Sequence, residues 1–191
     1  MRNPLSERKQ DAIKAKLIES CRICWERYGY KKTGVAELAS MAGISTGAFY
    51  SFFPSKEMLF MATVDAFVKK LYALMANYRP KTPTKQDFAA GFKQCTDEMF
   101  KNKWVFSLRE DAETFLRKLP EDFLEQDFRQ DVLDITAVVD LYGLAAKVSM
   151  EEIVAVFHTL LMSIYLTEII GPSHRQALDL LIDSAINDLF E

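Results

Sequence analysis

Apolar residues recur at steps of three and four along most of this 191-residue chain, and that spacing constrains the fold more than any other feature of the sequence. Between residues 6 and 28, the apolar stripe consists of Ile13, Leu17, Cys21, Cys24, Trp25 and Tyr28. The sequence contains no convincing run of the alternating apolar and polar positions that are typical of a half-buried strand. It therefore predicts an all-α protein.

Glycine and proline divide the chain into helices. Gly29 follows the first helix, and a short second helix is expected to end at Gly43, because glycine readily adopts the left-handed conformation that ends a helix. A third helix is expected to begin at Ser45, whose hydroxyl can cap it, and to end before Pro54.

A longer helix, residues 55–79, leads into the proline-containing joint RPKTPTK. Beyond this joint the spacing predicts helices near residues 85–101, 104–111, 120–144, 149–170 and 173–190. We expect two domains, 1–56 and 80–191, connected by the 55–79 helix.

Charge is distributed unequally between these parts. Residues 1–80 contain 13 lysines and arginines against 7 acidic residues, whereas residues 81–191 contain 11 against 20. A basic first part and an acidic second part indicate that only the first faces a polyanion. Chance segregation of solvated charges would give the same pattern.

The stretch GISTGAFYSFFPSKEML, residues 43–59, places small and hydroxyl residues directly before four aromatic ones. Two short helices joined by a tight turn that contains a glycine are typical of a helix-turn-helix, whose second helix presents its first residues to the major groove. Small residues there let the backbone approach DNA closely. We expect Phe49 and Phe52 to point inward and hold the helix. The pattern predicts binding to double-stranded DNA.

The longer stretch TGVAELASMAGISTGAFYSFFPSKEML, residues 33–59, preceded by WERYGY, resembles the N-terminal domain of the TetR (tetracycline repressor) family of bacterial regulators. The resemblance implies a three-helix helix-turn-helix DNA-binding domain followed by a helical ligand-binding and dimerisation domain. It places these residues at DNA-facing positions: Thr33, Ser45, Thr46, Gly47, Ala48, Tyr50, Ser51 and Lys56. It also implies a homodimer on a pseudo-palindromic operator.

The last two expected helices have the apolar character of an interface. Two of them from each subunit would form a four-helix bundle, with Phe157, Leu161, Ile164, Tyr165, Leu181 and Ala185 as candidate interface residues. The alternative is that both helices form the core of a monomer. The uncharged run 153–167 is short of the ~20 residues that a membrane-spanning helix needs, so we expect no membrane association.

Aromatic and methionine side chains recur in the second part of the chain. An apolar pocket with few polar groups is the usual form of a small-molecule site, and we expect one for an apolar or aromatic effector. The candidate lining residues are Phe92, Met99, Trp104, Phe106, Phe128, Tyr142 and Met162. A plain core made of the same residues is the alternative.

These observations lead to the hypothesis of a ligand-responsive transcriptional repressor. Two alternatives stay open: a constitutive DNA-binding regulator without effector, and an all-helical enzyme or scaffold that does not bind DNA. The sequence shows no nucleophile elbow, P-loop or dinucleotide fingerprint, so we expect no enzyme activity and no cofactor.

The cysteines give no sign of a metal site. Cys21 and Cys24 have the spacing of a zinc half-site, but no second pair or suitably spaced histidine accompanies them, so we expect no metal. Both lie on the apolar stripe of the first helix and are interpreted as small apolar residues, with redox sensing as an alternative. Three cysteines and no secretory signal favour a cytoplasmic location.

Overall fold

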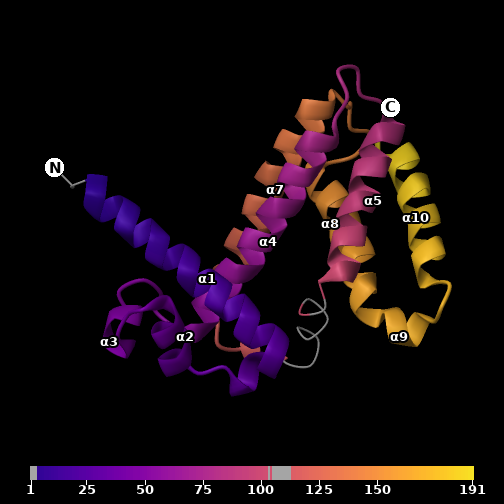
Figure 1. Ribbon diagram of the computed structural model, residues 1–191. Helices are drawn as coiled ribbons and strands as arrows, with labels where there is room; N and C mark the ends of the chain where they lie inside the picture. The colour runs from indigo at the N-terminus through magenta and orange to yellow at the C-terminus, as the bar shows by residue number, and fades with distance from the viewer. Residues whose placement is uncertain (1–3, 103, 105–112) are drawn as a thin grey trace. The chain divides into compact units, whose positions relative to one another are not determined.

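The computed structural model describes residues 4–102, 104 and 113–191, with side chains from residue 7 onward (Figure 1). Within these residues the protein is helical, apart from one isolated antiparallel bridge between Ala146 and Phe190. The all-α prediction is confirmed. The chain forms two compact units, residues 1–68 with 107–119 and residues 69–106 with 120–191.

The first unit contains α1 (Pro4–Lys32), α2 (Val35–Ala42), α3 (Thr46–Phe49) and the first turns of α4 (Lys56–Tyr78). Inside α1, Gly29 has a φ of 74°, so the helix axis breaks there and one further turn follows. Leu17, Cys21 and Trp25 lie on the buried side of α1, as the apolar spacing predicts.

An aromatic cluster forms the core of this unit. Trp25 and Tyr30 pack against Phe60 of α4, at ring-centroid distances of 4.4 and 5.1 Å. Phe115, from the segment 113–119, lies against the same three rings at 5.6 to 6.5 Å. The core of the first unit is thus completed by a residue far along the sequence.

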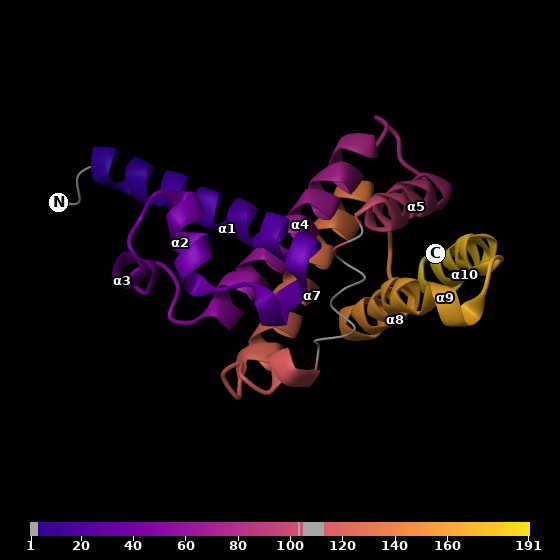
Figure 2. The same ribbon diagram turned by 60° about the horizontal axis from the view of Figure 1, so that its bottom comes forward.

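The second unit is a helical bundle built from the rest of α4 and from α5 (Lys85–Lys101), α7 (Phe123–Tyr142), α8 (Met150–Ser163), the 3₁₀ helix η1 (Ile164–Leu166), α9 (Thr167–Ile170) and α10 (His174–Leu189) (Figure 2). Phe88 and Phe92 of α5 pack on Phe157 of α8. The end of the chain belongs to this core, because Phe190 is fully buried against Phe88. The Glu191 N–H donates to the Ala145 carbonyl at 2.9 Å.

Local signals set the helix bounds. Thr84 and Asp87 form a capping box at the start of α5, and Ser149 and Glu152 form another at the start of α8. The predicted helix 85–101 matches α5, whereas the predicted helix 149–170 is three consecutive segments. The expected helix 104–111 lies almost wholly outside the described residues.

Candidate nucleic-acid interface

The turn between α2 and α3 has the geometry of a helix-turn-helix. Gly43 ends α2 in the left-handed region, with a φ of 75°, where a side chain would be strained. Ser45 then caps α3, because its Oγ accepts the Ala48 N–H at 3.1 Å. The cap predicted from the sequence is confirmed, and it fixes the direction in which α3 begins.

One buried side chain anchors α3. Phe49 is fully buried, and Phe53 lies beside it at a ring-centroid distance of 6.3 Å. The prediction that Phe52 points inward with Phe49 is wrong in its second half, because Phe52 is only half-buried. The helix ends at Phe49, and the N–H groups of Phe52 and Phe53 both turn back to the Phe49 carbonyl, which changes the residue that faces the core.

The opposite side of α3 is open. Ser45, Thr46, Gly47 and Ser51 are exposed and Ala48 is half-buried. Tyr50 is 55% exposed and its ring stands edge-on against Phe49. Nothing lies closer than 4.0 Å to the position of a side chain on Gly47, so this glycine leaves open space in front of the helix. The first turn of α3 therefore presents a surface of small side chains and hydroxyl groups.

Lys56 is placed differently from the expected phosphate contact. Its Nζ donates to the carbonyls of Tyr30 and Thr33, at 3.0 and 3.1 Å, and lies 4.0 Å from the Tyr30 ring centroid. The ammonium group thus satisfies carbonyls at the C-terminal end of α1, where the helix dipole favours a cation. The hydrogen bonds of the Lys56 ammonium group are thus made to groups within the protein.

The Thr33 side chain is also buried and hydrogen-bonded within the protein. It is 1% exposed, and its hydroxyl donates to the Gly29 carbonyl at 2.8 Å. The expectation that Thr33 faces DNA has no support in this geometry. The small residue Gly34, not Thr33, stands at the N-cap of α2, without a side-chain cap.

A polar network lies beside these two residues. The Tyr30 hydroxyl donates to the Glu57 carboxylate, and Lys118 Nζ donates to the Tyr30 hydroxyl at 3.2 Å. Burial and the Glu57 carboxylate raise the pKa of Tyr30, so its hydroxyl keeps its proton. Burial acts to raise the pKa of Glu57, but hydrogen bonds from Tyr30 and the backbone and the charge of Lys118 outweigh it and lower that pKa. The network ties α1, α4 and the segment 113–119 together.

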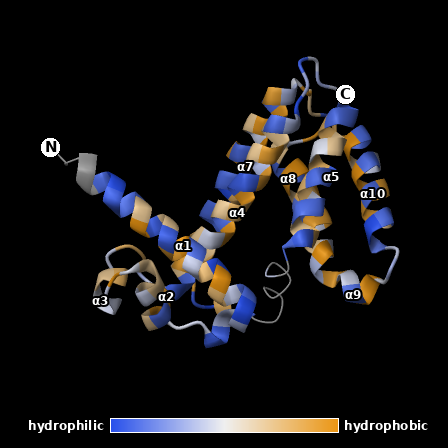
Figure 3. Ribbon diagram, viewed as in Figure 1, coloured by the Kyte–Doolittle hydropathy of each residue, from blue (hydrophilic) through white to orange (hydrophobic). Residues whose placement is uncertain are grey.

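The second unit carries a broad exposed apolar surface, which we call the α8–α10 face. It consists of Met162, Leu166, Ile169, Ile170, Leu180 and Leu181, each at least 41% exposed. The segment Met150–Ile170 is apolar (Figure 3) and is long and apolar enough to cross a membrane, yet only 22% of its most apolar 18-residue window is buried. An exposed apolar surface of this kind is typical of an interaction site.

The candidate interface residues divide into two groups. Leu181 is exposed, and Leu161, Tyr165 and Ala185 are half-buried. Phe157 and Ile164 are buried inside the protomer, where Phe157 packs on α5, so their side chains are not available to a partner.

The predicted effector-lining residues mostly fill the core instead of lining a space. Phe92, Met99, Trp104 and Tyr142 are at most 5% exposed, and the Tyr142 hydroxyl donates to the Met75 carbonyl at 2.8 Å. Phe128 is half-buried beside His158, and Met162 belongs to the α8–α10 face. Phe106 lies outside the described residues.

A groove of about 370 Å³ lies elsewhere, between α4 and α7. Alanines form much of its lining, with Tyr72 from α4 and Asp134, Val138 and Leu141 from α7. The Tyr72 hydroxyl donates to Asp131 at 3.2 Å, and Asp131 also lies 3.1 Å from His158 Nε2. Burial and the carboxylates of Asp131, Asp134 and Asp127 raise the pKa of Tyr72, so it stays a neutral donor.

The three cysteines are free and buried. Burial raises the pKa of Cys21 and of Cys95 to about 12, and it also raises that of Cys24. At neutral pH these thiols are protonated, and a protonated thiol is a poor nucleophile and metal ligand. Among the described residues, no three histidine, cysteine or acidic side chains converge in a way that could hold a metal ion.

Comparison with known proteins agrees with this geometry. The family model described as "Bacterial regulatory proteins, tetR family" matches residues 17–63, which include the helix-turn-helix. Two Bacillus subtilis proteins, the uncharacterized HTH-type transcriptional regulators YuxN and YerO, are 35% identical over 65 residues and 28% identical over 146 residues. These alignments cover 34% and 73% of this chain, but 22% and 48% of the relatives, so the chain spans less than half of their length.

The fold is similar over nearly the whole chain to that of SmeT, the repressor of the Stenotrophomonas maltophilia multidrug efflux pump SmeDEF. The TM-score is 0.61 at 14% identity, with 93% of this chain and 90% of SmeT covered. SmeT has also been solved in complex with triclosan. At this identity the likeness concerns the fold alone.

A capped, glycine-turned α2–α3 pair in an all-helical chain of this architecture defines a helix-turn-helix transcriptional regulator. With the match of residues 17–63, the helix-turn-helix part of the chain belongs to the TetR family of bacterial regulators.

Proposed function

We propose that this regulator is a repressor that binds a pseudo-palindromic operator as a homodimer and leaves it when a small-molecule effector binds. The observation that carries the proposal is the first turn of α3, which is capped by Ser45, anchored by buried Phe49 and open on its outer side. We expect the protein to act in the cytoplasm and to have no enzyme activity.

DNA contacts are assigned to Ser45, Thr46, Gly47, Ala48, Tyr50 and Ser51. Thr46 can exchange a hydrogen bond with a base edge, and the Ala48 methyl group can touch a thymine methyl group. The hydroxyls of Tyr50 and Ser51 suit phosphate oxygens, which position a protein without reading sequence. Thr33 and Lys56 are left out because their side chains are engaged inside the protein.

Dimerisation is assigned to the α8–α10 face. Its leucines, isoleucines and methionine would leave water on pairing with the same face of a second copy, as a two-fold interface requires. Such a dimer would carry two α3 helices, which fit half-sites one DNA turn apart, about 34–36 Å.

The effector is assigned to the groove between α4 and α7, whose volume is within the range of small-molecule sites. Apart from Lys69, Tyr72 and Asp134 its lining is apolar, which suits a largely apolar or aromatic compound, and the complex of SmeT with triclosan supports such a ligand in a protein of the same fold. Since the first turns of α4 belong to the first unit, a displaced α4 would move residues of the unit that contains α3.

The experiment is genomic footprinting followed by measurement of the bound site. We expect protection of a two-fold symmetric site by the unaltered protein and loss of protection with Gly47→Glu, which adds bulk and negative charge in front of α3. Compounds that raise the melting temperature should weaken this binding. Protection without symmetry would contradict the dimer, and protection that no stabilising compound relieves would favour a constitutive regulator.

A further inference from the structure

The two halves of α1 differ in the ion pairs that their basic residues form. In the second half, Arg22 pairs with both Glu19 and Glu26, at 2.6 and 3.1 Å. In the first half, Arg8, Lys9 and Lys16 are exposed and take part in no ion pair within the described part of the chain. The first half of α1 therefore carries exposed cations that no acidic side chain pairs within the described residues.

Three of the four basic residues of the first half, Arg8, Lys9 and Lys16, lie on one side of the helix. Lys9 and Lys16 are seven residues apart, which is two turns, so they share one side at a separation of about 10 Å. Arg8 adjoins Lys9 on that side, and Ala12 lies between them and Lys16 without covering either. The acidic residues Glu7 and Asp11 share a different side with Lys14.

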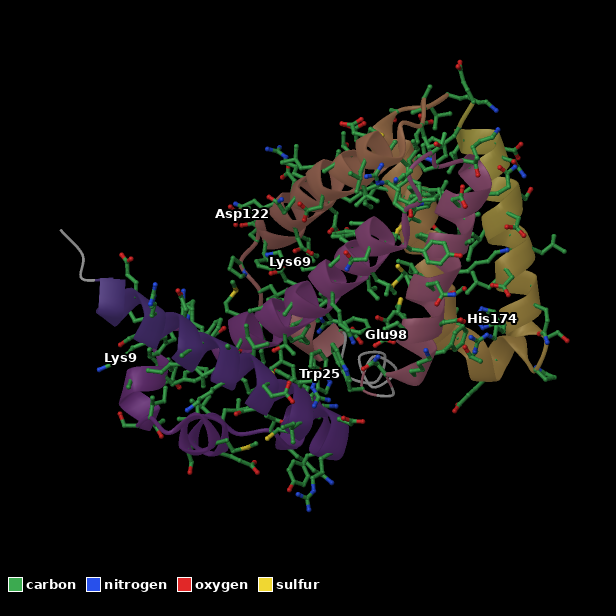
Figure 4. All side chains as sticks on the ribbon, turned by 45° about the horizontal axis from the view of Figure 1, so that its top comes forward. Lys9, Trp25, Lys69, Glu98, Asp122 and His174 are labelled. Atoms are coloured by element: carbon green, nitrogen blue, oxygen red, sulfur yellow. The ribbon has the colours of Figure 1, made fainter. Side chains whose placement is uncertain are left out.

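This stripe lies at the α3 end of the first unit. In Figures 1 and 2, α3 is beside the N-terminal half of α1, and the other half of α1 extends away from it. Figure 4 shows Lys9 on the part of α1 that is nearest to α3. A duplex lying against the first turn of α3 would pass the stripe, whereas Lys31 and Lys32 are at the opposite end of α1.

The first unit needs exposed cations if it is to bind the phosphate backbone of DNA. Phosphate contacts supply most of the sequence-independent affinity of a DNA-binding protein. Lys56, at the start of α4, is occupied by the carbonyls of Tyr30 and Thr33, and the open side of α3 carries hydroxyls but no charge. The exposed stripe on α1 is the nearest group of cations without an ion-pair partner in the described part of this unit.

We propose that Arg8, Lys9 and Lys16 form a second DNA contact, which grips the phosphate backbone next to the groove that holds α3. The contact rests on the proposed DNA-binding function and adds to it a phosphate-binding side of α1. Lys9 and Lys16 lie about 10 Å apart on the helix and have long side chains, so they can bind two phosphates of the same strand. The contact adds affinity without selecting sequence.

The test is the salt dependence of binding to a fluorescent 30-base-pair duplex of mixed sequence, compared between the unaltered protein and the K9Q/K16Q variant. Each phosphate contact contributes about 0.9 to the slope of log K against log salt, so the variant should lose about 1.8 of slope for each bound subunit and about 3.6 for a dimer. Equivalently, the ratio of the two affinities should change about 12-fold per subunit, or about 150-fold for a dimer, between 50 and 200 mM salt. Both side chains are exposed, so the variant is expected to unfold at the same temperature as the unaltered protein.

The matched control is K31Q/K32Q, which removes the same charge from the far end of the same helix and should leave the slope nearly unchanged. K9R/K16R should restore it. An unchanged slope in K9Q/K16Q, or an equal loss in K31Q/K32Q, would overturn the α1 contact while DNA binding itself stands. If the unaltered protein fails to bind the duplex even at 20 mM salt, the proposed function fails together with the contact.

Discussion

The surroundings of α3 and the α8–α10 face both carry large apolar side chains, but only the first buries them within one chain. Phe49 is fully buried, as are the rings of Trp25 and Phe60. On the α8–α10 face, Ile169 is 67% and Leu180 is 69% exposed. The difference teaches that the first unit has a complete core of its own, whereas the second unit leaves apolar surface exposed to water. Damage to the first should appear as lost stability at any concentration, and damage to the second as lost association.

The largest effect is expected from Phe49→Ala. Truncating a fully buried phenylalanine typically costs about 3–5 kcal/mol of unfolding free energy, and α3 has little else to hold it. Urea unfolding followed by circular dichroism measures the loss. Tyr50→Ala, at the exposed neighbouring position, should leave stability within about 0.5 kcal/mol while weakening DNA binding. Equal destabilisation by both variants would break the contrast between the two sides of α3.

The second effect concerns association. Leu180→Glu with Leu181→Glu should convert a dimer to a monomer, because four charges would otherwise be buried in each interface. We expect a loss of operator affinity of at least 100-fold, about 2.7 kcal/mol. Sedimentation velocity measures the assembly state. Leu133→Glu changes a residue on α7 that is 64% exposed and outside the face, so it should leave the assembly state unchanged.

A smaller effect is expected from Ser45→Ala. It removes the acceptor of the Ala48 N–H and should cost about 1 kcal/mol of unfolding free energy. Thermal unfolding is a sufficient measure. Ser51→Ala, which removes a hydroxyl that caps no helix, is the control. If Ser45→Ala leaves the unfolding temperature unchanged, packing of Phe49 alone fixes the start of α3.

The effect that is smallest at neutral pH, and grows only in alkali, is a pH dependence caused by the buried thiols of both cores. Burial raises the pKa of Cys95 to about 12, whereas the same thiol ionises near pH 9 in the unfolded chain. The native state therefore retains a proton that the unfolded state loses, so the contribution of Cys95 is complete below pH 9 and is lost as the pH rises toward 12. Cys95→Ala should remove this loss, which is at most about 1.4 kcal/mol per pH unit. Urea titrations of both proteins at pH 8, 9.5 and 10.5 test it.

Features fixed by neighbouring residues could be predicted from the sequence. The Ser45 cap depends only on the three residues that follow it, and the end of α2 depends on the left-handed backbone of Gly43. The start of α5 depends on the capping box that precedes it.

Features fixed by distant residues could not be predicted. Lys56 has the sequence context of a surface lysine, and its engagement depends on how the end of α1 approaches α4. Aromatic composition does not distinguish a ring that lines a space from one that fills it, so Phe92 and Tyr142 were expected in a pocket that alanines on α4 and α7 instead provide. Phe52 was misplaced because spacing does not show that α3 ends after one turn.

Phe115 also limits how this regulator can be dissected. A fragment cut after α4 would keep the complete α2–α3 turn but lose the fourth ring against Trp25, Tyr30 and Phe60, together with the Lys118 bond to the Tyr30 hydroxyl. Water would reach an indole and two aromatic rings that the intact chain keeps dry. Shortened versions made for crystallography or as DNA-binding tools would therefore tend to aggregate unless residues 113–119 are supplied, fused or added as a separate peptide.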